Sequence, residues 1–173
     1  MMLDGGRMII RKLQSHDLQI LLTIANELPE WFTKIARHEF IPTDLRHQEG
    51  FVAVNGSEPI GFITLYVAEG RLNIGWLGVR KECQRQGTGT LLLRRAEERA
   101  RELGIRELAT CTLGESVDYV PYKQTRKFYF KNGFTVYQKS KTDNPEFPEE
   151  LRIKKLVTQP SSGTTAVLLQ RSI

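Results

Sequence analysis

A glycine-rich loop between a strand-like and a helix-like segment constrains this chain most. Residues 84–89 read Gln-Arg-Gln-Gly-Thr-Gly. The apolar, β-prone stretch 72–79 precedes them, and residues 88–103 follow with apolar side chains at helical spacing. The first N–H groups of a helix have no intrahelical partner, and the helix dipole favours negative charge there. The pattern therefore predicts a phosphate site, where Gly87 and Gly89 let a pyrophosphate approach the backbone without a Cβ in the way.

The spacing of this loop excludes two commoner phosphate loops. A dinucleotide fingerprint needs a third Gly or Ala where Leu92 stands. A nucleoside-triphosphate loop needs Gly-Lys-Ser/Thr after four intervening residues, and the chain has no such run. What remains is Gln-x-x-Gly-x-Gly, which resembles the acyl-CoA pyrophosphate loop of the GCN5-related N-acetyltransferase (GNAT) superfamily.

A second block extends the resemblance. Residues 122–134 read Tyr-Lys-Gln-Thr-Arg-Lys-Phe-Tyr-Phe-Lys-Asn-Gly-Phe, which is similar to the late helix of the superfamily, with Gly-Phe opening the next strand. One expected strand, 106–113, separates the two blocks, as in the superfamily. The resemblance covers roughly residues 8–140 and implies an α/β fold in a single domain, 1–173. Its sheet would be mixed and mostly antiparallel, with flanking helices.

Hydrophobic patterning agrees with that fold. Residues 8–12 predict a first strand, and Ser15 is expected to cap a helix that carries Asp17 in its first turn. A second short helix, 30–40, is expected to stop at Pro42.

Strands then follow one another. Residues 51–54 and 59–68, joined through an Asn-Gly turn, predict a β-hairpin. The strand 72–79 before the glycine loop would complete three antiparallel strands.

Beyond residue 140 the pattern loosens. A turn-rich insertion, about 143–163, contains a possible short helix at 149–157 and precedes a final strand at about 164–173. Superfamily members usually join their last two strands by a shorter connection. The insertion could cover the acceptor site, form a dimer contact, or only decorate the surface.

Composition sets the broad class. A chain of 173 residues with 40% hydrophobic and 26% charged residues is typical of a soluble globular domain. It has no apolar run long enough to span a bilayer and no secretory signal, so a cytoplasmic location and no membrane partner are expected. The two cysteines, Cys83 and Cys111, fit a reduced compartment and are expected to be small buried hydrophobic residues.

The net charge of +5 invites a nucleic-acid interpretation. The basic residues are scattered, however, and Glu is interleaved among those of the long helix, so a solvated helix face is the simpler explanation. No nucleic-acid partner is expected, because the phosphates of acetyl-CoA offer another use for positive charge. A monomer or a homodimer is compatible with the sequence.

The resemblance implies roles for particular residues. The Leu77-Gly78-Val79 backbone would pair with the pantetheine arm, and the Val79 N–H would be the oxyanion donor. Tyr129 would direct its phenol at the coenzyme sulfur and stabilise the departing thiolate; core packing is its alternative role. The residues expected to bind the coenzyme, besides these, are Gln84, Arg85, Gln86, Gly87, Thr88, Gly89, Thr90 and Tyr122.

Two positions depart from the superfamily pattern. Many members have Asn where Tyr122 stands, and histone-modifying members have a Glu base where Asn73 stands. Asn cannot accept a proton at neutral pH. Glu115 and Asp118 are the nearest acidic candidates along the chain, with turn or capping roles as the alternative.

The acceptor pocket of the superfamily is normally built from the N-terminal helices. Five residues there would form a basic and aromatic lining that suits an acceptor bearing a carboxylate: Trp31, Phe32, Lys34, Arg37 and His38. Core packing is the alternative role of the two aromatic residues.

The sequence thus favours an enzyme that moves an acetyl group from acetyl-CoA to an amine of a small molecule or peptide, by direct attack in a ternary complex and without a metal. The alternative is a non-catalytic CoA-binding regulatory module of the same fold. Tyr129 argues against that alternative, and the missing Glu and Asn argue for it. A nucleic-acid-binding domain is the third hypothesis.

Overall fold

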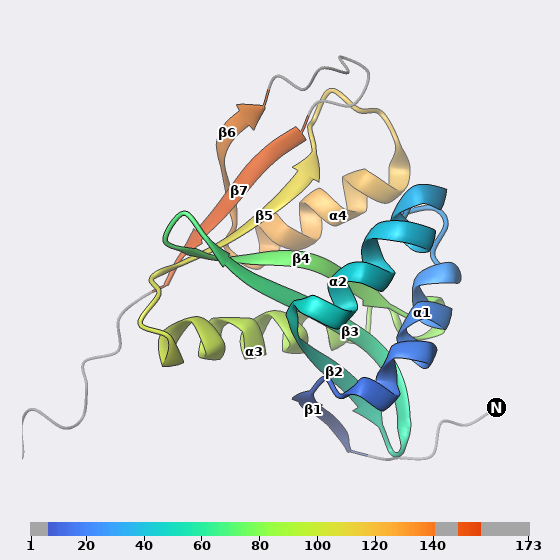
Figure 1. The fold of residues 1–173 in the computed structure, drawn as a ribbon. Helices are drawn as coiled ribbons and strands as arrows, with labels where there is room; N and C mark the ends of the chain where they lie inside the picture. Colours follow the sequence, from blue (N-terminus) through green and yellow to red (C-terminus); the bar gives the residue numbers. More distant parts are fainter. Residues whose placement is uncertain (1–6, 141–148, 157–173) are drawn as a thin grey trace, which may run out of the picture.

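A seven-stranded sheet forms the centre of the protein. The computed structural model describes residues 7–140 and 149–156, and the strand order is β1-β2-β3-β4-β5-β7-β6 (Figure 1). All neighbouring strands are antiparallel except β4 and β5, which are parallel. The strands are β1 (Met8–Lys12), β2 (Glu49–Asn55), β3 (Glu58–Ala68), β4 (Arg71–Val79), β5 (Glu107–Leu113), β6 (Thr135–Ser140) and β7 (Glu149–Lys155).

Four α-helices and three short helical turns connect the strands. They are η1 (Ser15–Asp17), α1 (Leu18–Asn26), the π-helical turn η2 (Ala36–Phe40), α2 (Ile41–His47), η3 (Lys81–Cys83), α3 (Thr88–Glu102) and α4 (Val120–Lys131). None of the helices in these described segments is long and apolar enough to cross a membrane.

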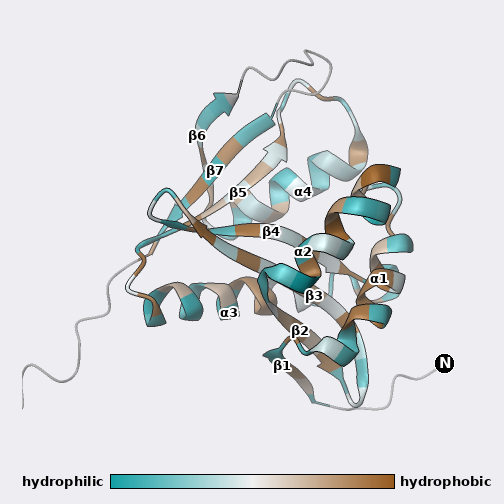
Figure 2. Cartoon of the chain, viewed as in Figure 1, coloured by the Kyte–Doolittle hydropathy of each residue, from teal (hydrophilic) through white to brown (hydrophobic). Residues whose placement is uncertain are grey.

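The helices cover both faces of the sheet. One core cluster joins α1 and the η2–α2 segment to Val52, Val54 and Phe62, and the other joins α3 and the end of α4 to Phe51 and Ile63. Strands β2 and β3 are therefore apolar on both faces, as strands between two helical layers are. Helices α1, α2 and α3 each carry hydrophobic and hydrophilic residues (Figure 2), as helices buried on one side do.

Strands β4 and β5 separate along their length. They pair only at Leu72 with Leu108 and at Asn73 with Ala109. Beyond these pairs β4 continues to Val79, so its last six residues have no partner on the β5 side. This gap holds the candidate site.

A bulge in β4 changes the direction of the strand where the gap begins. Leu65 faces Ile74, whereas Ile63 faces Leu77, so β4 contains one extra residue. The Gln48 amide fills the space beside Gly75, where a Cβ would overlap it and would lie 2.7 Å from the Thr64 hydroxyl. Glycine is required here for close packing.

The first strand, the three-stranded antiparallel segment, the helix after the glycine loop and the late helix are confirmed. Ser15 is not the cap: the Asp17 carboxylate accepts the Gln14 N–H at 2.9 Å, and Arg11 holds its pKa low. Pro42 does not stop a helix, because it lies in the first turn of α2, where proline is tolerated.

The prediction of a helix at 149–157 is wrong. Residues Glu149–Lys155 form β7, which lies between β5 and β6. Its burial pattern suits a strand: Glu150 and Arg152 are buried on one face, Glu149 and Leu151 next to them are more exposed, and Ile153 is also buried. About a third of the expected insertion is therefore part of the sheet, and the expected final strand at 164–173 lies outside the described residues.

Candidate active site

The glycine loop forms an open helix N-terminus. Arg85 and Gly87 have left-handed backbone conformations, with φ of 60° and 85°, and such loops form concave anion sites. Gly87 is the N-cap of α3; no side chain caps this helix, and its first turn contains no acidic residue. The buried Thr88 hydroxyl has no hydrogen-bond partner among the described residues. These features fit a bound phosphate.

Gln84 ties this loop to the end of β4. Its Nε2 donates to Val79 O at 3.0 Å. For Gly89 the structure gives a reason different from the expected one: a Cβ would lie 3.0 Å from the Phe128 ring. Glycine therefore lets α3 approach α4, and a substitution would disturb packing as well as any ligand.

A first cavity of about 480 Å³ lies between the loop, the end of β4 and α4. Leu77, Gly78 and Val79 line it together with Gln84, Arg85 and Gly89. Of the other expected loop residues, Gln86 and Gly87 are exposed, Thr90 is half-buried, and Thr88 is buried.

The charged side chains on the wall of this first cavity are all cationic: Arg85, Lys127 and Lys131. The two lysines were missed at the sequence level. The feature that could have indicated them is their i,i+4 spacing, which places both on one face of α4. Gln124 and Phe128 of the same helix also line this cavity.

The Val79 backbone points into the gap between β4 and β5. Arg80 donates its N–H to Ile60 O on β3 at 2.9 Å. Successive N–H groups of an extended strand point to opposite edges, so the Val79 N–H points away from β3. A backbone donor there is positioned before any ligand arrives.

Tyr129 is held by the end of its own helix. Gly133, at φ 90°, ends α4; the Phe134 N–H donates to Tyr129 O at 3.0 Å and the Gly133 N–H to Phe130 O at 3.0 Å. This is a Schellman motif, in which the residues at its two ends pack together. The Tyr129 and Phe134 rings accordingly meet edge to face at 5.2 Å. Gly133 and Phe134 thus fix the position of the Tyr129 side chain.

Burial raises the pKa of Tyr129 to about 12, and an interaction with the Thr110 hydroxyl opposes the rise. The side chain is only 5% exposed. The phenol therefore stays protonated at any physiological pH and can act as a hydrogen-bond donor.

A second cavity, of about 830 Å³, lies on the other side of Tyr129. It is bounded by the α1–η2 segment, the bulge of β4, the end of β5 and the start of α4. Five residues line both cavities: Trp31, Phe32, Leu77, Thr125 and Tyr129. The two cavities therefore meet at the phenol and at the unpaired end of β4.

The expected acceptor residues divide into two groups. Trp31 and Phe32 lie on the wall of the second cavity, whereas Lys34, Arg37 and His38 do not. Lys34 and His38 are exposed, and Arg37 turns back to donate to Phe32 O at 3.1 Å. The expected basic lining is therefore wrong.

Tyr122 lies on the second cavity and not on the first. Its hydroxyl donates to Trp31 O at 3.0 Å, and Trp31 Nε1 donates to Pro121 O at 3.3 Å. These reciprocal bonds fasten the α1–η2 segment to the start of α4. Tyr122, which stands where many members of the superfamily have Asn, thus connects these two segments.

Asn73 and the acidic candidates lie outside both cavities. The Asn73 amide donates to Ala68 O and Arg71 O, both at 3.2 Å, and so supports the β3–β4 turn. Asp118 is paired with Lys123, which lowers the pKa of its carboxyl, and Glu115 is exposed. Of the two cysteines, Cys83 is buried as expected, but Cys111 is exposed on the second cavity.

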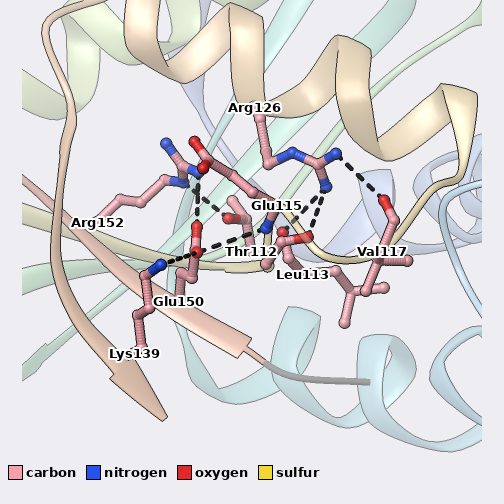
Figure 3. A network of polar contacts seen from close by, with 9 residues as sticks. Thr112, Leu113, Glu115, Val117, Arg126, Lys139, Glu150 and Arg152 are labelled. Carbon is pink, nitrogen blue, oxygen red and sulfur yellow. Dashed lines mark hydrogen bonds and ion pairs between the residues drawn. The ribbon is translucent and has the colours of Figure 1, made fainter. Parts of the chain in front are cut away.

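A buried polar network supports the wall of the second cavity (Figure 3). Arg126 of α4 donates to the carbonyl oxygens of Leu113, Gly114 and Val117 at 3.0 to 3.3 Å. Next to it, Arg152 of β7 contacts Thr112 at 2.9 Å and Glu150 at 2.8 Å.

These contacts hold the β5–α4 loop against the sheet. Both members of the Arg152–Glu150 pair have side chains only 4% exposed. The sequence offered no sign of this network, because its partners come from three separate elements. The described residues contain no group of three or more His, Cys, Asp or Glu that could hold a metal ion.

Comparison with known proteins points to one family. A family model described as an acetyltransferase (GNAT) domain matches residues 46–136. The uncharacterized protein YdhI of Bacillus subtilis (strain 168) is 31% identical over 103 residues, which cover 58% of this chain and 63% of that protein. The match therefore spans less than two thirds of this relative.

Solved structures share the fold. A GNAT-family protein from Desulfovibrio desulfuricans has a TM-score of 0.75 at 19% identity, covering 87% of this chain and all of the other. The PaiA N-acetyltransferase of Thermoplasma acidophilum, in complex with coenzyme A, has a TM-score of 0.68 at 22% identity, covering 86% and 99%. A GNAT acetyltransferase from Elizabethkingia anophelis with bound acetyl-CoA has a TM-score of 0.64 at 20% identity, covering 86% and 98%.

Proposed function

Because the chain belongs to the GNAT family of acetyltransferases, we propose that it is an N-acetyltransferase that moves an acetyl group from acetyl-CoA to an amine of a small molecule or peptide. The amine nitrogen attacks the thioester carbonyl directly with both substrates bound: the C–N bond forms, the C–S bond breaks, coenzyme A leaves as its thiolate, and the proton of the amine passes to solvent water.

The observation that carries this proposal is the opposite charge of two cavities that meet at one phenol. Among the residues that the structure describes, the charged ones on the first wall are three cations, and those on the second wall are two carboxylates, Glu30 and Glu149. A polyanionic donor suits the first wall and a cationic acceptor suits the second. Tyr129 and Leu77 lie where the two ligands would meet.

Each group has a defined task in this proposal. Acetyl-CoA supplies the activated acetyl group. The open N-terminus of α3, with Arg85, Lys127 and Lys131, would bind its phosphates. The Val79 N–H would donate to the carbonyl oxygen as negative charge develops on it.

Tyr129 would donate a hydrogen bond to the sulfur as it departs. With a phenol pKa of about 12 and a thiol pKa of about 8.5, complete proton transfer would be uphill by roughly 5 kcal/mol. The phenol therefore stabilises the thiolate by a hydrogen bond and keeps its own proton.

Calorimetry with acetyl-CoA and thiol release with a panel of amines test the proposal together. Neutralising both lysines (Lys127→Ala with Lys131→Ala) should weaken acetyl-CoA binding roughly ten-fold at low salt, at about 1 kcal/mol or less for each exposed charge. Lys123→Ala is the matched control, because Lys123 lies on α4 but pairs with Asp118 outside the first cavity.

The outcomes separate the competing functions. Binding without turnover of any amine would favour the non-catalytic CoA-binding module. Absence of acetyl-CoA binding, or an equal loss in the Lys123 variant, would contradict the assignment of the first cavity.

A further inference from the structure

The second cavity has an aromatic wall. Seven of its 21 lining residues are aromatic; besides Tyr129 they are Trp31, Phe32, Phe40, Trp76, Tyr119 and Tyr122. Its volume of about 830 Å³ lies within the range of cavities that bind small organic ligands. Flat side chains in such number favour a flat or apolar ligand body.

The polar groups of these aromatic residues are largely engaged elsewhere. Trp76 Nε1 donates to Asp44 at 2.6 Å, Trp31 Nε1 donates to Pro121 O, and the Tyr122 hydroxyl donates to Trp31 O. Phe32 meets Trp76 edge to face at 5.7 Å, which fixes both rings. These rings are therefore preorganised and offer ring surface, and the other polar groups of the wall are mainly the hydroxyls of Tyr119, Tyr129 and four threonines.

The charges on this wall have one sign. Glu30 and Glu149 are its only charged residues in the described part of the chain; Lys, Arg and His are absent from it. Lys81 pairs with Glu30 Oε1, which lowers the pKa of this carboxyl and offsets part of its charge. Glu30 Oε2 is buried without a hydrogen-bond partner among the described residues and can accept from a ligand. A ligand carboxylate would find no cation on this wall, and burying it without a counter-ion is unfavourable. An ammonium group meets carboxylates and ring faces, both of which attract cations.

We propose that the acceptor is a primary amine carried by an aromatic or apolar body that lacks a carboxylate. This inference rests on the proposed function and specifies its substrate class. It reverses the expectation of a carboxylate-bearing acceptor, because the basic residues behind that expectation lie outside the cavity. It also disfavours polyhydroxylated amines, since their hydroxyls would lose hydrogen bonds to water against the rings.

Matched acceptors isolate the carboxylate from the size of the ligand. Phenylalanine and phenylalanine amide share the ring and nearly the same volume; the amide lacks the carboxylate charge, and its ammonium group also loses a proton more easily. 2-Phenylethylamine and tryptamine lack the carboxylate but have a more basic amine than phenylalanine, so they show whether amine basicity explains the preference. At saturating acetyl-CoA, kcat/KM from thiol release should be at least about 100-fold higher for the amide and for both simple amines than for phenylalanine.

A cation introduced into the wall of the second cavity should reduce the preference for phenylalanine amide over phenylalanine. Cys111 lies on the second cavity, so Cys111→Lys should bring phenylalanine within about ten-fold of its amide, whereas Cys111→Ser should keep the full preference. The comparison of acceptors on the unaltered protein stands even if the lysine variant fails to fold.

Calorimetry with acetyl-CoA shows whether a negative result contradicts only the substrate class or also the proposed function. If acetyl-CoA binds and phenylalanine is acetylated as well as its amide, the substrate class is overturned and the proposed function stands. If acetyl-CoA binds and no amine is acetylated, the proposed function falls, and the substrate class falls with it.

Discussion

At the scale of single residues, the proposed reaction gives a role to Tyr129 and none to Asn73. Tyr129→Phe removes the hydroxyl and keeps the ring that packs on Phe134, so acetyl-CoA should bind unchanged. Loss of one hydrogen bond to a developing charge, about 1.5–3 kcal/mol, should lower kcat roughly ten- to hundred-fold. Asn73→Ala is the control on β4, because its amide bonds only the β3–β4 turn. Steady-state kinetics that show full activity in Tyr129→Phe, or a greater loss in Asn73→Ala, would contradict this division.

The same phenol should make folding sensitive to alkali. Its pKa is about 12 in the folded protein and about 10 in an unfolded chain. A raised folded-state pKa contributes stability that is fully present below pH 10 and is lost as the pH rises to 12. The contribution is about 3 kcal/mol. Urea unfolding of wild type and Tyr129→Phe at pH 8 and pH 11.5 should show the larger loss in wild type; equal losses would mean that the phenol is not desolvated.

At the scale of elements, the C-terminus of α4 positions the phenol. Gly133→Ala would place a Cβ on a residue at φ 90° and 3.3 Å from the Lys154 side chain. A left-handed non-glycine residue costs about 1–2 kcal/mol, and a shift of the α4 end should displace Tyr129. We therefore expect lower stability together with a lower kcat.

Gly104 provides a matched control for this glycine. It ends α3 in the same way, at φ 70°, with Ile105 N bonded to Ala100 O at 2.8 Å. Gly104→Ala should reduce stability by a similar amount and leave kcat unchanged. If both variants lose kcat equally, the effect follows from general destabilisation and not from the phenol.

At the scale of the whole molecule, the Arg152–Glu150 pair connects β7 to the loop that lines the second cavity. Arg152→Met leaves the Glu150 carboxylate buried without its main partner, which should cost about 3–5 kcal/mol in unfolding free energy. Replacing both residues, as Arg152→Met with Glu150→Leu, should cost less than the single change, because no isolated charge remains.

Lys139→Ala is the control for this pair. Lys139 reaches the same carboxylate at 3.9 Å from a side chain that is 75% exposed. Exposed pairs contribute about 0–1 kcal/mol, so denaturant unfolding should show little change. A double variant less stable than Arg152→Met alone would show that the pair contributes net stability beyond avoiding a buried charge.

Local patterns in the sequence determined most of the elements and the family resemblance. The Asn-Gly turn, the Gln-x-x-Gly-x-Gly loop and the Gly-Phe after α4 each act within a few residues, so their geometry follows from local backbone preferences. Where the prediction was wrong, contacts with residues distant in the sequence determined the structure. The segment 149–155 became a strand because β5 and β6 flank it, and pairing of that kind overrides local propensity.

The charge of the second cavity was decided by tertiary structure alone. Spacing placed Lys34, Arg37 and His38 near Trp31 in the chain, but none of the three lines the cavity. The acidic and aromatic wall is instead assembled from five segments that lie far apart in sequence, and the pKa of Tyr129 depends on how completely they bury it. Burial and electrostatics depend on what surrounds a group in space, and local sequence does not contain that information.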